Sequence, residues 1–376
     1  MSKKVGILTF HCVPNYGAIL QAYAFKTFLQ KTEKSDISII DFQCKGNSLG
    51  FEPKRYLKSI ADSKNPFKKI VKKTIVALLT KRSYTKKCAG FAQFAEEKLN
   101  IAQYDDKMYY TYDYLFCGSD QIWNCDITNG FQAPYFGANK PDDSVAVVSS
   151  YAASCGDIAE FNSEKKKKLF ANVSKLDHVG VRESTLAEVL KKNGINAVAT
   201  VDPTFLLTKE NYIEDLELDT NKRGKPFILQ YSLRKSSNLD EAAKKISKEK
   251  KLPIVKVCGY VRVIPEKGKF DVGPKEFLQL LLSSEYVVTN SFHGVALSLV
   301  FEKNFNSILP PSRKGRVTDL LQTIGCSNRI WDGNSELDLS DIDYGSISPV
   351  LNNCINQSKR YIESVFASEV NNGQRV

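Results

Sequence analysis

Short runs of apolar residues alternate along this chain with longer stretches in which apolar residues recur every three or four positions. Runs of the first kind are typical of buried strands, and stretches of the second kind predict amphipathic helices. In the first half, the predicted strands are residues 5–10, 37–42, 114–118, 145–151, 178–182 and 197–202, with predicted helices at 18–30 and 184–193. Strands that alternate with helices in this way predict an α/β fold with a parallel sheet.

The same alternation begins again after Pro226. The predicted strands are residues 227–233, 253–260, 286–290 and 305–309, and the predicted helices are 239–250, 274–284, 294–301, 316–324 and 348–366. Because residues 207–226 are polar and mixed in charge, we place a domain boundary there. We expect two Rossmann-like domains that face a cleft, at residues 1–208 and 209–345. Residues 346–376 would form a C-terminal helix and tail in a position to pack back on the N-terminal domain.

One segment, residues 54–87, interrupts this pattern because it is almost entirely basic, with Asp62 as its acidic residue. It reads as an insertion in the N-terminal domain. Within it, apolar residues fall at helical spacing opposite Lys68, Lys69, Lys72 and Lys73. Such a helix either packs on the protein's own core with a solvated basic face or rests on an anionic membrane surface. Nucleic acid is the less favoured partner, because the sequence has no helix-turn-helix, RNP or zinc module.

Composition and charge indicate what kind of partner and which cellular location to expect. The chain has 376 residues, 42% hydrophobic and 25% charged, with a net charge of +11, which points to a negatively charged partner. Its nine cysteines include no C-x-x-C pair, and we find no compact set of metal ligands, so we expect no metal and no disulfide framework. With neither a signal-peptide pattern nor a stretch of membrane-spanning length, we expect a cytoplasmic protein, with a peripheral place at the inner membrane face as a further option.

Polar residues directly after predicted strands mark the candidate site, because ligands bind beyond the carboxyl ends of parallel strands. After the first strand, NYGAILQ offers Asn15 as a helix cap, Gly17 for close backbone approach, and Tyr16 and Gln21 on the same turn. There is no Gly-x-Gly-x-x-Gly or Walker pattern in the chain, which gives no indication of a dinucleotide or P-loop site.

The run CGSDQIWN follows another strand and resembles a sugar site, because carboxylates and amides bind hydroxyls and an aromatic face covers the sugar ring. Its candidates are Ser119, Asp120, Gln121, Trp123 and Asn124. The alternative is that Asp120 caps a helix and Trp123 lies in the core. Ser154, in YAASCG, suits either close packing or phosphate binding.

In GVRE, Arg182 ends a strand and is suited to a phosphate or carboxylate, or else to a structural ion pair. The stretch TNSFHG is the most informative: Asn290, Ser291 and Gly294 surround His293 at a strand-to-helix turn. His293 is the histidine best placed for proton transfer among the three in the chain. Arg313 and Arg316 lie on a loop that follows a later strand.

Taken together, NYGAILQAYA, CGSDQIWN, YAAS, GVRE, VDPTFLL and SFHG resemble, in order, the pattern of the polysaccharide pyruvyl transferase family. The resemblance implies a glycosyltransferase-B-like fold and transfer of the enolpyruvyl unit of phosphoenolpyruvate onto a sugar, usually closing to a pyruvate ketal. It implies phosphoenolpyruvate as donor substrate with no further cofactor, and His293 and Arg182 as the family's histidine and arginine.

This sequence departs from the family pattern at Ser291, where some members have an arginine. The donor anion would then be held by Arg182, Arg234, Arg313 or Arg316. We expect His293 to act as general acid and Asp120 to assist the attacking hydroxyl. The acceptor would be nucleotide-linked or lipid-linked, as in the synthesis of surface polysaccharides.

Two other functions remain open at this point. One is a nucleotide-sugar glycosyltransferase of the same fold, since fold does not settle function. The other is a non-catalytic protein that recruits enzymes to the membrane through residues 54–87.

Overall fold

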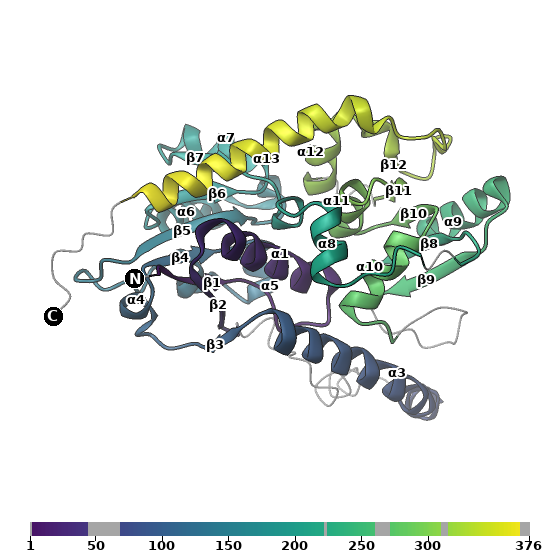
Figure 1. Cartoon of the computed structure of the whole chain (residues 1–376), viewed down its shortest axis with the longest axis horizontal. Helices are drawn as coiled ribbons and strands as arrows, with labels where there is room; N and C mark the ends of the chain where they lie inside the picture. Colours follow the sequence, from purple (N-terminus) through teal and green to yellow (C-terminus); the bar gives the residue numbers. More distant parts are fainter. Residues whose placement is uncertain (1, 44–67, 222–223, 260–270, 310–314, 369–376) are drawn as a thin grey trace.

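The computed structural model describes residues 2–43, 68–221, 224–259, 271–309 and 315–368, with the backbone alone for residues 68–82. Within these residues, the chain forms two parallel sheets that lie side by side, one in each half of the sequence (Figure 1). The α/β class and the division into two Rossmann-like sheets are as the sequence predicts.

The first sheet has seven strands in the order β3-β2-β1-β4-β5-β6-β7. These are β1 Lys4–Leu8, β2 Asp36–Asp41, β3 Ile101–Gln103, β4 Tyr114–Cys117, β5 Val147–Ala153, β6 His178–Val181 and β7 Ala197–Ala199. The six predicted strands are confirmed. The edge strand β3 is absent from the prediction because its three residues are too short and too exposed to produce an apolar run.

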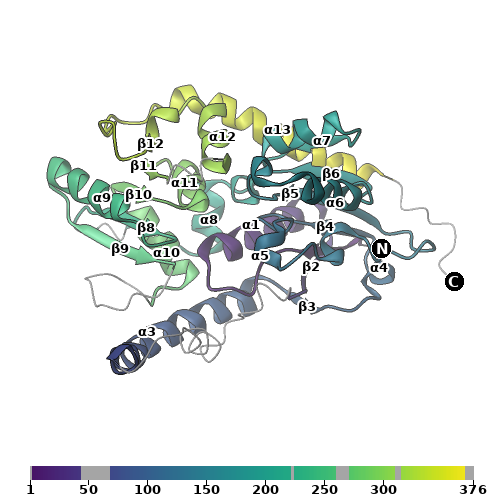
Figure 2. The same ribbon diagram turned by 180° about the vertical axis from the view of Figure 1, so that it is seen from behind.

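Helices connect these strands and cover the sheet. They are α1 Tyr16–Glu33, α3 Lys68–Lys98, α4 Met108–Thr111, α5 Cys125–Thr128, α6 Ser163–Val173 and α7 Ser184–Lys192, with a 3-10 turn η3 at Pro203–Phe205. In α1, the residues from Tyr16 to Leu29 are buried except Lys26, because apolar side chains occur on every side of the helix in this stretch. It therefore packs in the middle of the molecule, between the sheets, rather than on the surface (Figure 2).

The second sheet has five strands in the order β12-β11-β10-β8-β9. These are β8 Ile228–Ser232, β9 Ile254–Cys258, β10 Tyr286–Thr289, β11 Asn304–Ile308 and β12 Ile330–Trp331. Its helices are α8 Lys209–Asp215, α9 Ser237–Lys250, α10 Pro274–Ser283, α11 Phe292–Val300 and α12 Gly315–Thr323. The four predicted strands are confirmed, and the two-residue strand β12 is again too short to be predicted.

The two halves share one hydrophobic core. A single cluster of buried residues includes Val5 and Phe116 from the first sheet and Val257 and Phe305 from the second. Tyr16, at the start of α1, joins them directly: its hydroxyl donates to the carbonyl of Val272 at 2.8 Å, and its ring stacks on Phe277 with centroids 4.5 Å apart. The sheets are thus held in a fixed relation at the base of the site described below.

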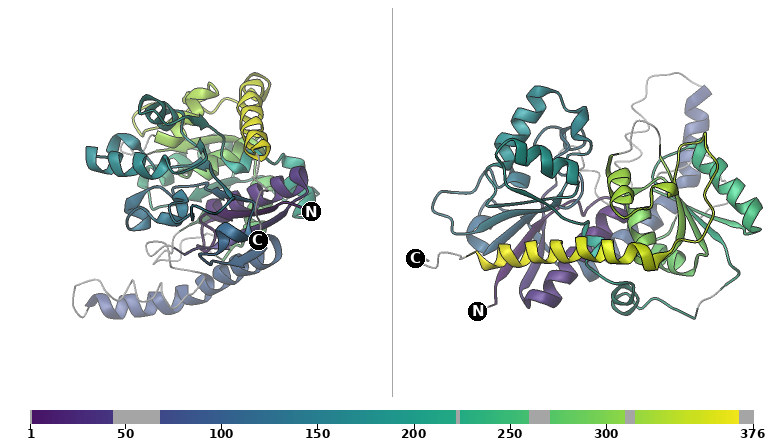
Figure 3. Two further views of the ribbon diagram at one scale, coloured as in Figure 1. Left: turned by 90° about the vertical axis from the view of Figure 1, so that its left-hand side faces the viewer. Right: turned by 90° about the horizontal axis from the view of Figure 1, so that it is seen from above.

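The last helix, α13 (Tyr344–Ala367), runs along both halves of the molecule (Figure 3). Near its start, the Tyr344 hydroxyl donates to the Lys303 carbonyl of the second half at 2.7 Å. Near its end, the Tyr361 hydroxyl donates to the Ser150 carbonyl of β5, also at 2.7 Å. The helix therefore connects the two sheets independently of the chain between β7 and β8.

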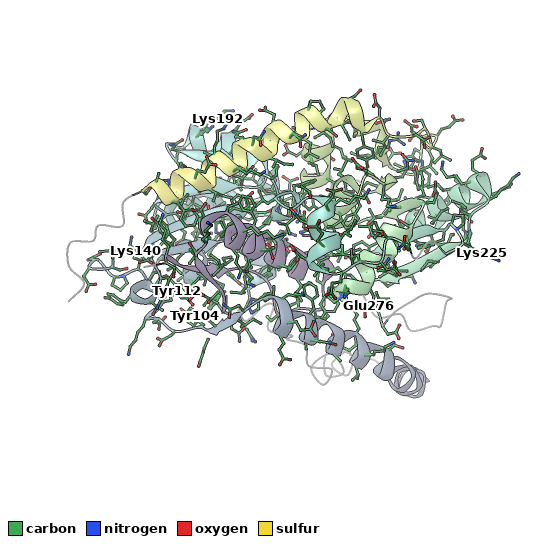
Figure 4. The ribbon with its side chains drawn as sticks, viewed as in Figure 1. Tyr104, Tyr112, Lys140, Lys192, Lys225 and Glu276 are labelled. Atoms are coloured by element: carbon green, nitrogen blue, oxygen red, sulfur yellow. The ribbon has the colours of Figure 1, made fainter. Side chains whose placement is uncertain are left out.

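The basic segment becomes helix α3 from Lys68 onward, and its far end extends away from both sheets (Figure 1). Residues 54–67 and the side chains of residues 68–82 lie outside the described part, so the predicted basic face stays a prediction. Of the helices that the structure describes, none combines the length and apolarity that crossing a bilayer requires. Lys192 and Lys225 lie far apart on the periphery, so part of the positive charge is spread over the surface (Figure 4).

Candidate functional site

Polar residues that follow strands β4, β6 and β7 of the first sheet meet in one buried cluster. Ser119 comes shortly after β4, Arg182 directly after β6, and Asp202 three residues after β7. Their exposed fractions are 0%, 8% and 1%, so the cluster is almost closed to solvent. Parallel strands bring such residues together because their carboxyl ends share one edge of the sheet.

An ion pair between Arg182 and Asp202 forms the centre of this cluster. Arg182 Nη2 lies 2.6 Å from Asp202 Oδ2, and the Ser119 hydroxyl bonds to both groups. The other carboxylate oxygen accepts from the backbone N–H and hydroxyl of Thr204, at 3.0 and 2.8 Å. Burial by itself raises the pKa of Asp202, but the charges of Arg182 and His293 and these hydrogen bonds outweigh it and hold that pKa below its usual range.

His293 reaches the cluster from the second half of the chain. It is the second residue of α11, is 5% exposed, and places Nε2 3.3 Å from Asp202 Oδ2. On its other side lies Gly17 of α1, where an added Cβ would come within 2.1 Å of the imidazole Nδ1. A carboxylate at this distance orients the imidazole ring, as a histidine that transfers protons requires.

A second arginine joins from helix α12. Arg316 Nη1 lies 3.4 Å from Asp120 Oδ1, and Arg182 Nη1 lies 3.7 Å from the same oxygen. The Phe292 ring contacts both guanidinium groups, with its centroid 4.8 Å from Arg182 Cζ and 5.6 Å from Arg316 Cζ. The site therefore gathers two cations and an imidazole against two carboxylates, which is the charge an anionic substrate with several oxygens would need.

Glu183 is a further acid at this edge, directly after Arg182. It is 3% exposed, and its Oε1 accepts a hydrogen bond from the Ser154 hydroxyl at 2.6 Å. Burial raises the pKa of this carboxyl to about 7, although Arg182, the bond from Ser154 and Arg316 act in the opposite direction. Its second oxygen, Oε2, has no hydrogen-bond partner among the described residues.

A cavity of about 210 Å³ opens beside the ion pair. Its charged lining residues are Arg182, Glu183, Asp202, Arg316 and Asp319, and the rest of the lining mixes polar side chains with apolar ones from η3, α11, α12 and α13. His293 is not among the lining residues, but its Nε2 lies 3.3 Å from the carboxylate of Asp202, which is.

The predicted residues of the NYGAILQ turn have different surroundings. Asn15 caps α1 by accepting from the Gly17 backbone N–H at 3.0 Å, and Gly17 touches His293. Tyr16 instead packs between the two halves, away from the ion pair. Gln21 is fully buried and donates to the Thr9 hydroxyl and to the carbonyls of Phe10 and Ala18, so it holds the turn after β1 together.

Of the CGSDQIWN residues, Ser119 and Asp120 lie in the cluster and Trp123 does not. The Trp123 ring is fully buried, stacks on Phe136, and donates its indole N–H to the Tyr135 carbonyl at 3.0 Å. Its predicted place over a sugar ring is therefore not supported, and the core alternative is. Two further candidates bond to each other instead: Asn124 Nδ2 donates to Gln121 Oε1 at 2.8 Å.

The remaining candidates surround the turn that carries His293. Asn290 binds the backbone of Leu233 and Arg234, so it braces the loop after β8. Ser291 is 2% exposed at the cap of α11, and Arg234 is exposed. At Gly294, an added Cβ would come within 2.3 Å of the Thr289 hydroxyl, so this glycine serves close packing of the turn. Arg313 lies outside the described residues, and Ser154 acts on Glu183 as described above.

The sequence alone did not single out Asp202 or Glu183 as site residues. Asp202, in VDPTFLL, is the last residue of the predicted strand 197–202, and Glu183, in GVRE, directly follows the predicted strand 178–182. Position at a strand end, which indicates Arg182, therefore indicates these two residues as well. Among the described residues, no group of three or more histidine, cysteine or acidic side chains could hold a metal ion.

Comparison with known proteins identifies the family of this chain. A family model described as polysaccharide pyruvyl transferase matches residues 15–310. A search of curated proteins yields no match.

The similar solved structures resemble this chain in fold and hardly in sequence. A crystal structure of a UDP-N-acetylglucosamine 2-epimerase is 12% identical, with a TM-score of 0.52 and coverage of 98% of this chain and 97% of that one. The UDP-GlcNAc 2-epimerase from Neisseria meningitidis, bound to UDP-GlcNAc, is 10% identical, with a TM-score of 0.50 and coverage of 98% and 100%. These likenesses concern the fold alone, and they confirm the predicted glycosyltransferase-B-like α/β architecture.

Proposed function

This chain belongs to the polysaccharide pyruvyl transferase family, and from that premise we propose that it moves the enolpyruvyl unit of phosphoenolpyruvate onto a sugar hydroxyl. The product would be a pyruvate ketal on a nucleotide-linked or lipid-linked precursor of a surface polysaccharide. One observation carries the proposal. Arg182, Arg316 and His293, from separate parts of the chain, converge on the buried carboxylate pair of Asp120 and Asp202.

The arginines fit the charge of the proposed donor. Phosphoenolpyruvate carries a phosphate and a carboxylate, and guanidinium groups bind both with charge-assisted hydrogen bonds. Arg182 keeps two buried nitrogens, Nε and Nη1, without a hydrogen-bond partner among the described residues. A ligand that supplied oxygens there would satisfy a group that is otherwise costly to bury. Arg182 and Arg316 would thus serve in place of the arginine that Ser291 replaces.

His293 is the proposed acid. Its imidazolium gives a proton to the methylene carbon of the donor, which becomes a methyl group and leaves C2 electrophilic. The oxygen of a sugar hydroxyl then bonds to C2, the bond from C2 to the phosphate oxygen breaks, and phosphate leaves. A second hydroxyl of the same sugar bonds to C2 and closes the ketal. Asp202 lies 3.3 Å from Nε2 and orients the ring for this transfer.

The geometry favours another role for Asp120 than assisting the attacking hydroxyl. Its Oδ1 accepts from the Gln121 backbone N–H at 2.9 Å and faces both guanidinium groups. We therefore propose that Asp120 holds Arg182 and Arg316 in place for the donor.

Turnover of phosphoenolpyruvate tests the proposal. The purified protein would be incubated with phosphoenolpyruvate and a panel of nucleotide-linked and lipid-linked sugars, with phosphate release and acceptor mass followed together. We expect an acceptor to gain the mass of a pyruvate ketal, and His293→Ala to abolish that gain while its unfolding midpoint stays near that of the wild type.

His178→Ala is the matched control, because His178 begins β6 and bonds to the Ser368 hydroxyl instead of the ion pair. It should retain turnover. Substantial turnover by His293→Ala would remove the imidazole from the role of acid. Failure of phosphoenolpyruvate to bind at all would overturn the donor, and nucleotide-sugar transfer would then be tested with the same panel.

A further inference from the structure

Glu183 has the features of a working acid-base group, and the mechanism above does not use it. Its side chain is buried, one oxygen accepts from Ser154, and the other has no hydrogen-bond partner among the described residues. It lines the same cavity as Arg182 and Arg316. A buried carboxyl with an oxygen that lacks a hydrogen-bond partner is costly to keep, and such groups gather at functional sites.

Its surroundings explain why it is not a simple structural anion. Glu183 is the cap residue of α7, yet its side chain makes no capping hydrogen bond to that helix. Asp319 of α12 takes that position instead, accepting from the Ser184 hydroxyl at 2.6 Å and from the Ser184 backbone N–H at 3.2 Å. The Glu183 carboxyl therefore has no part in capping the helix.

The charged and titratable groups around Glu183 come from several elements. Arg182 precedes it in the chain, Arg316 and Asp319 come from α12, and Asp202 shares the cavity. The Cys155 thiol, in the loop after β5, also interacts with it electrostatically. The two arginines favour the ionised carboxyl and burial opposes it, which brings its pKa to about 7. The group can therefore both accept and release a proton near neutral pH.

We propose that Glu183 is the base of the transfer, taking the proton from the acceptor hydroxyl at the cavity, with Ser154 as the residue that positions it. This inference rests on the proposed function. The first hydroxyl loses its proton to Glu183 Oε2 as its oxygen bonds to C2, and the same proton leaves with the phosphate. The second hydroxyl loses its proton to His293, which restores the acid. Protons and charge balance over the cycle without any further reactant.

The test compares four proteins over a range of pH, with phosphoenolpyruvate and the acceptor that the wild type uses. Glu183→Gln keeps the shape and the bond from Ser154 but is unable to take a proton. We expect its kcat to fall by about 100-fold or more, with phosphoenolpyruvate binding retained. Glu188→Gln is the control, since it removes the same charge from an exposed position on the same helix.

The pH profile separates a base from a structural group. The wild-type rate should fall below about pH 7, because Glu183 must be ionised to act. Ser154→Ala removes a hydrogen bond that favours the ionised carboxyl, so this limb should move to higher pH. The Ser154 variant also serves if Glu183→Gln does not fold.

The outcomes are distinct. An undiminished kcat in Glu183→Gln, or an acidic limb that stays in place in Ser154→Ala, would overturn the inference and leave the proposed function standing. A wild type that turns over no phosphoenolpyruvate with any acceptor would overturn both.

Discussion

At the scale of single residues, the site leaves no room for a side chain at Gly17, beside His293. Gly17 is helical and lies directly against His293, where a Cβ would come within 2.1 Å of Nδ1. Since real atoms do not approach so closely, any side chain at this position forces the imidazole out of its present position. The first turn of α1 thereby sets the position of the proposed acid, although no charged side chain of α1 takes part in the ion pairs of the site.

Gly17→Ala should therefore lower turnover by about 10-fold or more while leaving the protein folded, because a small displacement of a catalytic group has a large effect on rate. Alanine suits the helical backbone better than glycine, so part of the strain is offset in stability. The measurement is kcat together with the unfolding midpoint.

A double-variant cycle identifies the contact. With His293→Ala already present, Gly17→Ala should no longer destabilise the protein, because the clashing ring is gone. An equal loss of stability in both backgrounds would show that Gly17 is required for a neighbour other than the imidazole.

Residue by residue, the sequence predicted which segments meet at the site better than which way each side chain points. Arg182, Asp120 and His293 were selected by their position after strands, and the structure brings them into one cluster. The same rule selected Trp123, whose ring turns into the core, and Gln21, which holds backbone carbonyls. Strand ends are predictable from apolar runs, but the direction of a side chain in the following turn depends on packing that comes from elsewhere in the chain.

At the scale of elements, one end of helix α3 packs on the core and the other extends away from both sheets. Its described end packs on the core through Phe91 and Phe94. There, Lys87 is 3% exposed, donates to the Cys258 carbonyl of β9 at 3.2 Å, and lies 4.7 Å from the centroid of the Tyr16 ring. The helix is thus fastened to the second sheet through a buried ammonium group.

Burial lowers the pKa of Lys87 to about 8, so the folded protein releases this proton at lower pH than the unfolded chain does. Between about pH 8 and the ordinary lysine pKa, the unfolded state binds more protons, and the stability of the wild type rises with pH. Lys87→Met lacks this contribution. The difference in unfolding free energy, wild type minus variant, should increase by about 2–3 kcal/mol from pH 7 to pH 10.

Chemical denaturation at both pH values gives this difference. Lys86→Met is the control, because that neighbouring lysine is exposed and pairs with Asp271. A difference for Lys87→Met that stays constant with pH would mean that Lys87 keeps an ordinary pKa in the folded protein.

The opposite end of α3 carries the predicted basic face. Replacing Lys68, Lys69, Lys72 and Lys73 with glutamine should weaken binding to anionic vesicles, by about 1 kcal/mol for each charge near the surface. Deleting the whole segment would be a poorer test, because it would also remove the buried Lys87. Co-sedimentation with vesicles of anionic and of neutral lipids measures the effect, and unchanged binding to the anionic vesicles would leave α3 as part of the fold alone.

At the scale of the whole molecule, the connections between the two sheets include the chain between β7 and β8, the contacts of Tyr16, and α13. The candidate site lies between these connections. An arrangement of this kind fixes residues from both halves at the distances that the ion pairs require, and it limits how far the halves can separate when a substrate enters.

Tyr361→Phe tests the contribution of α13. The change removes the hydrogen bond to the buried Ser150 carbonyl and should lower the unfolding free energy by about 1–2 kcal/mol. Tyr110→Phe is the matched control, because Tyr110 is 57% exposed and its bond to Asp143 is open to water. Equal effects of the two changes on the unfolding midpoint would mean that the end of α13 adds little to stability.

The path of α13 also has a consequence for the order in which the protein is made. Tyr114 and Phe116 of the first sheet pack against Phe366, and the Ser150 carbonyl accepts a hydrogen bond from Tyr361. More than two hundred residues separate these partners in the sequence. A ribosome therefore synthesises the sheet well before the helix that covers it. During that interval the growing chain exposes an apolar face, so this family member would depend on chaperones, or on slow translation of its second half, more than a protein whose first domain closes by itself.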